Sequence, residues 1–215
     1  MNSAFFFSNK QESGRNYQKY IFCSLASGKL LVTTGIPTIT SVKTESFDVD
    51  ASTTCQSLPA FPSTSFGATG AFVNNKVVIC GGAGLGTKCY TLGRNENTWT
   101  LSGNTIASRL GSASLEINNK LVIFGGLKLS STEEIDVDTG TATAGPNMPL
   151  EIYLPCAVKL NTTTALIIGG YDGSSELRST YFYDANVKSF TPGPYLKAGR
   201  YAHACSILNT GTESL

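Results

Sequence analysis

Residues 74–82 read NNKVVICGG, and residues 118–126 read NNKLVIFGG. The two stretches start 44 residues apart, and seven of their nine positions are identical. A third copy follows at the same step and ends in Gly169-Gly170, and a weaker copy at residues 29–35 lies 47 residues before the first. Self-similarity at a fixed period of this length indicates an array of repeated structural units.

A second short apolar stretch follows each copy, at residues 47–50, 90–93, 135–138 and 181–184. In two units an aromatic residue, Trp99 or Phe190, stands seven positions after the third residue of that stretch, whereas Gln56 and Ala144 stand there in the other two. The β-branched and aromatic content, the Gly, Asn and Ser between the apolar runs, and the lack of a sustained 3.6-residue period all predict strands.

This pattern resembles the kelch repeat, in which a hydrophobic strand ends in Gly-Gly and is followed by an aromatic-containing strand and an aromatic anchor. The resemblance covers residues 29–208 and is strongest in the last full unit, with Gly169-Gly170 and Phe190. It implies an all-β fold, a kelch-type β-propeller whose blades are four-stranded antiparallel sheets around a channel. Another repetitive all-β array, such as a different propeller or a sandwich, is the alternative.

In a propeller the blade strands are covered on both faces, which fits the near-continuous apolar runs. The glycine pairs would allow close backbone approach between blades, and we expect Gly82, Gly126 and Gly170 to hold equivalent positions. We read Trp99 and Phe190 as core residues wedged between blades.

The repeat phase predicts about four blades. The first complete unit should place strands at about 66–73, 76–82, 87–93 and 97–102. Residues 29–57 hold three strands and residues 200–208 a single innermost strand, so the two ends could combine into one blade and close a ring.

The same phase arises in an open or partial propeller, and we favour that arrangement. The predicted organisation is an N-terminal extension (1–28), the kelch-repeat propeller (29–208) and a C-terminal tail (209–215) that belongs to a truncated chain.

Charge and hydropathy exclude several classes of partner. The chain has 16 basic and 15 acidic residues, a net charge of +1, so no long-range field points to nucleic acid. No apolar stretch approaches the ~20 residues that span a bilayer, so we expect no membrane insertion within this chain. Residues 1–8 make a poor signal peptide because they lack a basic leader.

Six cysteines stand at positions 23, 55, 80, 89, 156 and 205. In a hairpin centred between residues 84 and 85, Cys80 and Cys89 face each other at a distance that a disulfide accepts. The pattern also looks like extracellular kelch proteins of invertebrates, a resemblance that implies a bridged pair; two buried thiols are the alternative. We expect Cys156 and Cys205 to face different ways and stay unpaired, because they stand one residue out of register on equivalent strands.

Catalytic chemistry is scarce in the sequence. His203 is the only histidine, in a stretch where kelch repeats often carry Arg and His, so we read it as structural. Copper oxidases similar to galactose oxidase use two histidines and two tyrosines, which this chain cannot supply alone. There is no hydrolase nucleophile elbow and no zinc-binding cysteine pair. We therefore expect no enzyme activity, no metal and no cofactor.

The loops vary while the strands repeat, which is how a propeller makes a binding face. One rim consists of the connections after the glycine pairs, at residues 36–38, 83–87, 127–131 and 171–176. Tyr171 and Asp172 offer an aromatic anchor and a charge there, and Arg109 and Arg200 stand just before innermost strands, where they could line the channel mouth.

We therefore predict a non-catalytic module that binds another protein through its propeller loops; a small-molecule ligand stays open. The predicted location is extracellular, with a cytoplasmic location as the alternative. The alternative functions are the substrate-recognition part of an intracellular ubiquitin-ligase adaptor or an actin-associated kelch protein, and a fragment of a galactose-oxidase-like enzyme.

Overall fold

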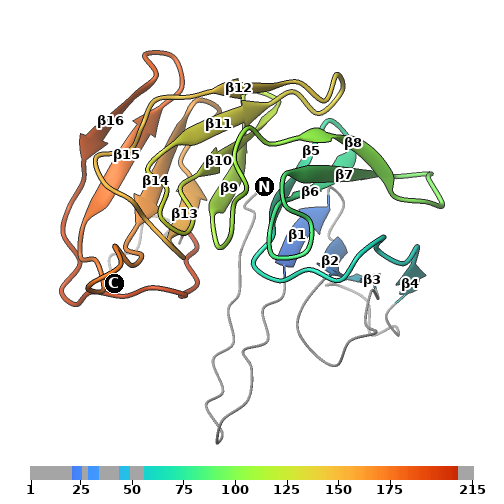
Figure 1. The fold of residues 1–215 in the computed structure, drawn as a ribbon, viewed down its shortest axis with the longest axis horizontal. Helices are drawn as coiled ribbons and strands as arrows, with labels where there is room; N and C mark the ends of the chain where they lie inside the picture. Colours follow the sequence, from blue (N-terminus) through green and yellow to red (C-terminus); the bar gives the residue numbers. More distant parts are fainter. Residues whose placement is uncertain (1–20, 26–28, 34–43, 49–55, 208–215) are drawn as a thin grey trace, which may run out of the picture.

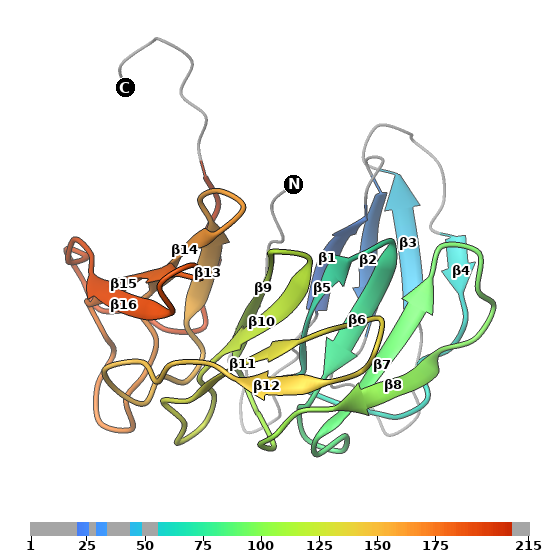
Figure 2. The ribbon, with the colours of Figure 1, turned by 90° about the horizontal axis from the view of Figure 1, so that it is seen from above.

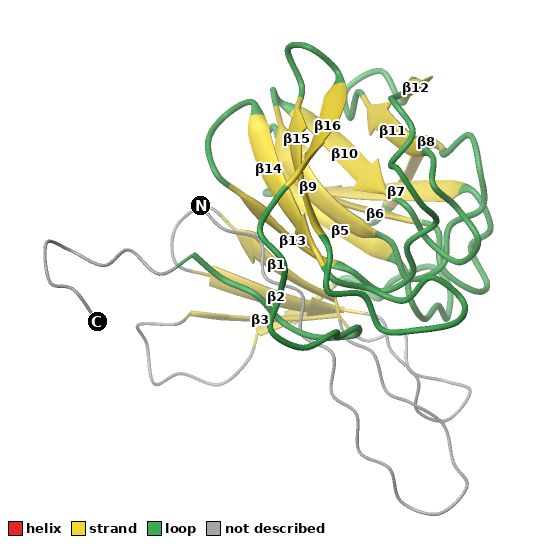
Figure 3. Cartoon of the chain, turned by 90° about the vertical axis from the view of Figure 1, so that its left-hand side faces the viewer, coloured by secondary structure: helices red, strands yellow, loops and turns green. Residues whose placement is uncertain are grey.

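The computed structural model describes residues 21–25, 29–33, 44–48 and 56–207, and the side chains from Leu58 onward. Within these ranges all regular structure is β-strand and no helix occurs (Figure 3). The strands are β1 (Ile21–Leu25), β2 (Lys29–Thr33), β3 (Thr44–Asp48), β4 (Gln56–Leu58), β5 (Thr69–Val73), β6 (Lys76–Cys80), β7 (Lys88–Gly93), β8 (Thr100–Asn104), β9 (Ala113–Ile117), β10 (Lys120–Phe124), β11 (Thr132–Ile135), β12 (Ala142–Ala144), β13 (Cys156–Lys159), β14 (Thr164–Ile168), β15 (Thr180–Asp184) and β16 (Ser189–Pro192).

The strands form four antiparallel sheets of four consecutive strands each: sheet I (β1–β4), sheet II (β5–β8), sheet III (β9–β12) and sheet IV (β13–β16). The first strand of each sheet is the innermost, and β1, β5, β9 and β13 lie beside one another in that order. The sheets follow one another round an arc, with sheets I and IV at its two ends (Figures 1 and 2). The predicted all-β propeller of about four blades in an open arrangement is confirmed.

Strands in the middle of the arc are buried on both faces, as their sequence predicts. In sheet II, Val77 and Ile79 face one cluster with Phe61 and Trp99. Their neighbour Val78 faces the opposite way, into a cluster that includes Leu121 of sheet III. Because side chains alternate along a strand, an apolar run supplies both interfaces at once.

The two aromatic anchors pack into the core as predicted. Trp99 is buried against Phe61 in the connection from sheet I to sheet II, with ring centroids 4.9 Å apart, and its Nε1 donates to Pro59 O at 3.0 Å. Phe190 contacts Tyr183 in its own sheet at 5.1 Å and Phe124 of sheet III at 6.3 Å, so it lies between sheets III and IV.

The glycine pairs occupy equivalent positions, which confirms that prediction. The amide of the second glycine donates to a backbone carbonyl of the following unit: Gly82 to Arg109, Gly126 to Ile152 and Gly170 to Arg200, at 2.6, 2.9 and 2.8 Å. Arg109 and Ile152 each stand four residues before an innermost strand, β9 or β13. A Cβ on the first glycine of each pair would meet the same carbonyls at 2.7, 2.5 and 2.5 Å. All six glycines have positive φ, so both the backbone angle and the close approach require glycine.

Successive units are linked by one backbone hydrogen bond each, between residues that lie just before the innermost strand or segment of each unit. The four residues involved, Gly67, Gly111, Leu154 and Ala202, all have left-handed φ, of 64°, 65°, 54° and 50°. Gly111 N donates to Gly67 O at 2.8 Å, Leu154 N to Gly111 O at 2.8 Å, and Ala202 N to Leu154 O at 3.0 Å. Four units therefore enter their innermost segment in one shared backbone geometry.

Two expectations about the chain ends are wrong. Sheet I contains its own innermost strand, β1, from within the expected extension 1–28, so it does not need a strand from the other end. Residues 201–207, expected as that strand, pair with no strand in the part of the chain that is described. The alternative in which the C-terminal segment closes a ring with sheet I therefore does not apply to residues 200–207, which agrees with the open arrangement that we favoured.

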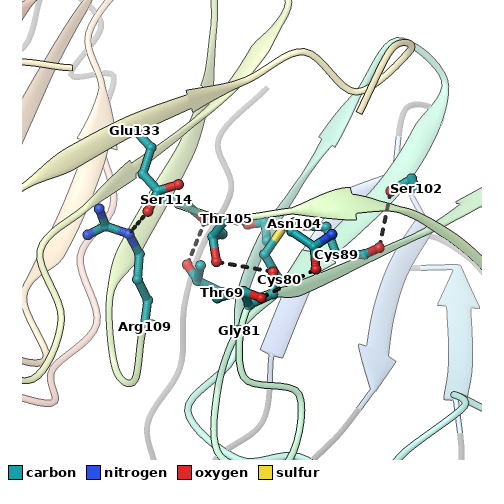
Figure 4. The surroundings of a disulfide bond; sticks show 12 residues. Thr69, Cys80, Gly81, Cys89, Ser102, Asn104, Thr105, Arg109, Ser114 and Glu133 are labelled. Atoms are coloured by element: carbon teal, nitrogen blue, oxygen red, sulfur yellow. Dashed lines mark hydrogen bonds and ion pairs between the residues drawn. A yellow bond between two sulfur atoms is a disulfide. The ribbon is translucent and has the colours of Figure 1, made fainter. Parts of the chain in front are cut away.

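Cys80 and Cys89 form the predicted disulfide (Figure 4). They are directly opposed in the β6–β7 pairing, with Cα atoms 4.1 Å apart, and both side chains are fully buried. The bridge therefore lies inside the interface with sheet III rather than on the surface.

Cys156 and Cys205 also form a disulfide, so the prediction that they stay unpaired is wrong. Innermost strands of neighbouring sheets are staggered by one residue. Thr69 and Ser114, two and three residues after their left-handed residue, meet at 2.7 Å between sheets II and III. Cys156 and Cys205 hold the same two positions in the next pair of units. A one-residue offset in sequence is thus what brings the side chains together.

Candidate binding site

Loops from two units surround a pocket of about 870 Å³ at the rim of the arc. The connection after β10, the approach to β13, the β14–β15 loop and the segment after β16 all contribute to it. The lining residues are Leu127, Lys128, Glu151, Tyr153, Tyr171, Asp172, Gly173, Ser174, Glu176 and Tyr201. The predicted rim loops at 127–131 and 171–176 are thus brought together, whereas residues 83–87 do not line the pocket and 36–38 lie outside the described residues.

Three tyrosines form the aromatic part of the pocket. The backbone of Tyr171 pairs with that of Tyr153 through two hydrogen bonds of 2.8 and 2.9 Å, which fix the base of the loop. The Tyr171 ring lies 5.4 Å from the Tyr201 ring, at an angle of 46°. Burial, together with the nearby Tyr201, raises the pKa of Tyr153 above its ordinary value, so its hydroxyl keeps its proton at neutral pH.

Asp172 is held in one orientation by its own loop. Its Oδ1 accepts hydrogen bonds from Ser175 N, Ser174 N and Ser174 Oγ, each at 2.8 Å. These bonds hold the pKa of the Asp172 carboxyl below its ordinary value, so it is ionised at neutral pH. All three bonds use Oδ1, which leaves Oδ2 for a ligand.

The charge of the lining is negative. Three carboxylates, from Glu151, Asp172 and Glu176, stand against the single ammonium of Lys128. Carboxylates next to the faces of tyrosine rings suit a cationic group, because both attract positive charge.

The prediction that Arg109 is a binding residue at the channel mouth is wrong. Its side chain is 1% exposed and forms an ion pair with the equally buried Glu133 (Figure 4). Its Nη1 donates to Gly125 O at 2.7 Å and to Ser131 O at 2.8 Å, and its Nη2 donates to Ser131 Oγ at 2.9 Å. Arg109 therefore ties the β8–β9 connection to the ends of β10 and β11.

Arg200 is exposed but does not line the pocket. The structure thus separates the four predicted binding residues: Tyr171 and Asp172 lie together in the pocket, Arg200 lies apart on the surface, and Arg109 is in the core.

Sequence reasoning missed Tyr153, Tyr201, Glu151 and Lys128. A signal for the tyrosines was present, because Tyr153 and Tyr201 each immediately precede the left-handed residue of their unit. The charged residues stand on irregular connections, where no repeat pattern indicates which side chains converge.

Within residues 58–207, no group of three or more His, Cys, Asp or Glu side chains is placed to hold a metal ion. A search of the described part of the chain also finds no helix long and apolar enough to cross a membrane.

Comparison with known proteins supports the fold alone. No protein-family model and no curated protein matches the chain. Among solved structures that match is one described as the structure of YjhT, with a TM-score of 0.71 at 13% sequence identity. The match covers 84% of this chain and 66% of that chain, which has a fold of the propeller type.

Proposed function

We propose that this chain is a non-catalytic protein-binding module that recognises its partner through the pocket at the rim of sheets III and IV. The observation that carries the proposal is the convergence of three tyrosines and three carboxylates from three separate connections on one pocket. Loops held on a rigid sheet scaffold are where binding residues concentrate, and Tyr is favoured at interface hot spots.

The lining favours a basic segment of a partner protein. An arginine or lysine side chain entering the pocket would meet Asp172 Oδ2 and the faces of Tyr171 and Tyr201. A volume of about 870 Å³ is larger than one side chain needs and matches the ~300–1,000 Å³ of ligand sites. The pocket therefore has room for two or three residues of an extended peptide.

We also propose that the repeat is of the kelch type. The equivalent glycine pairs, their shared hydrogen bonds and the position of Phe190 between blades support this assignment.

The proposed location is extracellular. Two disulfides support it, because such bonds persist in oxidising compartments and are rare in the cytosol. The Cys80–Cys89 bridge is buried, which would protect it from reducing agents while the sheets stay folded.

The test is selection of displayed random peptides on the folded chain, with counter-selection against a Tyr171→Ala/Asp172→Asn variant. We expect enriched peptides to carry Arg or Lys, and calorimetry to show that either single substitution weakens their binding about tenfold, or ~1.4 kcal/mol. Tyr195→Ala is the matched control, since Tyr195 is 74% exposed and does not line the pocket.

Enriched peptides that bind the Tyr171→Ala/Asp172→Asn variant as tightly as the parent would contradict the proposal. Circular dichroism of each variant must match the parent. We expect it to, because Tyr171 and Asp172 lie in a loop outside the buried core, and substitutions away from the core usually change stability by under ~0.5 kcal/mol.

A further inference from the structure

One sequence motif that the pocket does not use lies between β13 and β14. Asn161-Thr162-Thr163 has the form Asn-x-Thr with x other than proline, which is the acceptor sequence for N-linked glycosylation. No other asparagine of the chain is followed two positions later by Ser or Thr. The sequence therefore offers a single acceptor for this modification.

The acceptor stands on an exposed loop, residues 160–163, which joins β13 to β14. In sheets II and III the same connection consists of Asn74-Asn75 and Asn118-Asn119, all four with left-handed φ. Sheet IV has a longer connection instead, and both Asn161 and Thr162 are exposed on it. A bulky polar group attached to Asn161 would therefore extend into solvent and not into an interface between sheets.

The side chain of Asn161 is held through its oxygen. Its Oδ1 accepts hydrogen bonds from Thr163 N at 2.9 Å, from Thr164 N at 2.9 Å and from Thr163 Oγ1 at 3.2 Å. A backbone amide can only donate, so these bonds identify which end of the Asn161 amide is the oxygen. None of them uses Nδ2, the atom to which a sugar is joined, so the loop can keep its conformation when a sugar replaces one Nδ2 hydrogen.

We propose that Asn161 is a site of N-linked glycosylation. The donor is an oligosaccharide joined to a lipid diphosphate. In the transfer, Nδ2 forms a bond to the anomeric carbon of the first sugar, the bond from that carbon to the diphosphate breaks, and the lipid diphosphate leaves. The Nδ2 proton passes to a base of the transferring enzyme. The inference rests on the proposed extracellular location, which two disulfides support, and not on the proposed binding pocket.

The glycan lies at the opposite end of sheet IV from the pocket. Tyr153 precedes β13 and Tyr171 follows β14, whereas the loop 160–163 joins the other ends of these two strands. β14 has five residues, and at a rise of about 3.3 Å per residue its two ends are roughly 16 Å apart. The glycan therefore leaves the pocket open and marks the rim at the β13–β14 loop as a surface that faces solvent.

The test is secretion of the full chain from animal cells behind an added signal peptide, followed by mass spectrometry. We expect the intact protein to lose the mass of one glycan when an amidase releases N-linked sugars. The same treatment in heavy-oxygen water should convert Asn161 to a labelled aspartate. The added signal peptide directs the chain to the secretory pathway, so the result reports on the acceptor site and not on the natural location.

Three variants distinguish the motif from a general effect on the loop. Thr163→Ala should abolish the modification, because the hydroxyl of the third residue is part of the acceptor sequence. The conservative Thr163→Ser should keep it. Thr162→Ala is the matched control and should also keep it, because the middle position accepts any residue except proline.

An unmodified Asn161 in chains that have formed the Cys80–Cys89 bridge would overturn the proposal, since the bridge shows that those chains reached an oxidising compartment. A glycan that persists in Thr163→Ala would overturn it as well. Failure of the proposed pocket gives a different result: displayed peptides would bind the Tyr171→Ala/Asp172→Asn variant as tightly as the parent, while the glycan on Asn161 would be unchanged.

Discussion

Replacing Arg109 with methionine should destabilise the protein far more than removing an ordinary ion pair. The substitution keeps an unbranched apolar side chain but leaves Glu133 as an uncompensated charge in a site that is 1% exposed. It also removes the donors to Gly125 O and Ser131 O. Breaking a buried pair in this way costs about 3–5 kcal/mol, a large part of the roughly 5–15 kcal/mol that stabilises a domain.

The measurement is equilibrium unfolding in urea. Trp99 is the only tryptophan and is buried against Phe61, so its fluorescence reports unfolding without interference. With a dependence on urea of about 2–3 kcal/mol per molar, the midpoint should fall by roughly 1–2.5 M.

Lys159→Met is the matched control. It also replaces a cation with methionine and breaks an ion pair, with Glu116, but those side chains are 20% and 25% exposed. We expect a loss of under about 1 kcal/mol there. The double variant Arg109→Met/Glu133→Gln should recover part of the loss, because no charge is left unpaired. Equal midpoints for Arg109→Met and Lys159→Met would refute the reasoning that burial makes Arg109 a structural residue.

Three further outcomes are expected. Gly126→Val should prevent sheet III from folding, because Gly126 has a φ of +125° and its Cβ would lie 2.9 Å from the hydroxyl of Ser112. The control Gly86→Ala has open space around it and should lower the free energy of unfolding, measured by thermal melting, by only about 1–2 kcal/mol. Mass spectrometry of non-reduced digests should show Cys80 linked to Cys89, and both residues freely alkylated in secreted protein would contradict the proposed location. Burial lowers the pKa of His203, so the unfolded chain binds a proton at this residue more readily than the folded protein does. The contribution of His203 to the free energy of unfolding should therefore be constant above about pH 6.5 and decrease below it, and the variant His203→Asn should not show this decrease.

The fold could be predicted because its signal is local and repeated. The glycine pair, the apolar run before it and the aromatic anchor lie within about one hairpin, and their spacing recurs at the period of the units. Trp99, Phe190 and the Cys80–Cys89 pair followed from this spacing. Strand β1 did not, because an innermost strand carries no glycine pair and is identified only by the strand with which it pairs.

The errors at Arg109 and at Cys205 share a physical cause, which is that each depends on contacts between segments far apart in the sequence. Arg109 is buried by groups 16 to 24 positions away in the sequence. The Cys156–Cys205 bridge depends on the stagger between neighbouring sheets, which spans 49 residues and is invisible in the repeat pattern. The pocket, likewise, exists only once four connections from two units are brought together.

The Cys156–Cys205 disulfide determines how the protein would carry mechanical load. A pull on the C-terminal end would pass from Cys205 directly to β13, the innermost strand of sheet IV, and β14–β16 would bear no tension while the bond is intact. The bond closes a loop of 49 residues, which cannot be extended while the bond is intact. The contour length of this loop is about 165 Å at roughly 3.4 Å per residue. With the bond reduced, the same pull would act on β16, the outermost strand of sheet IV, and would break its hydrogen bonds to β15 one after another, which would release that length. The redox state of Cys156 and Cys205 would thus determine whether sheet IV can be extended under force.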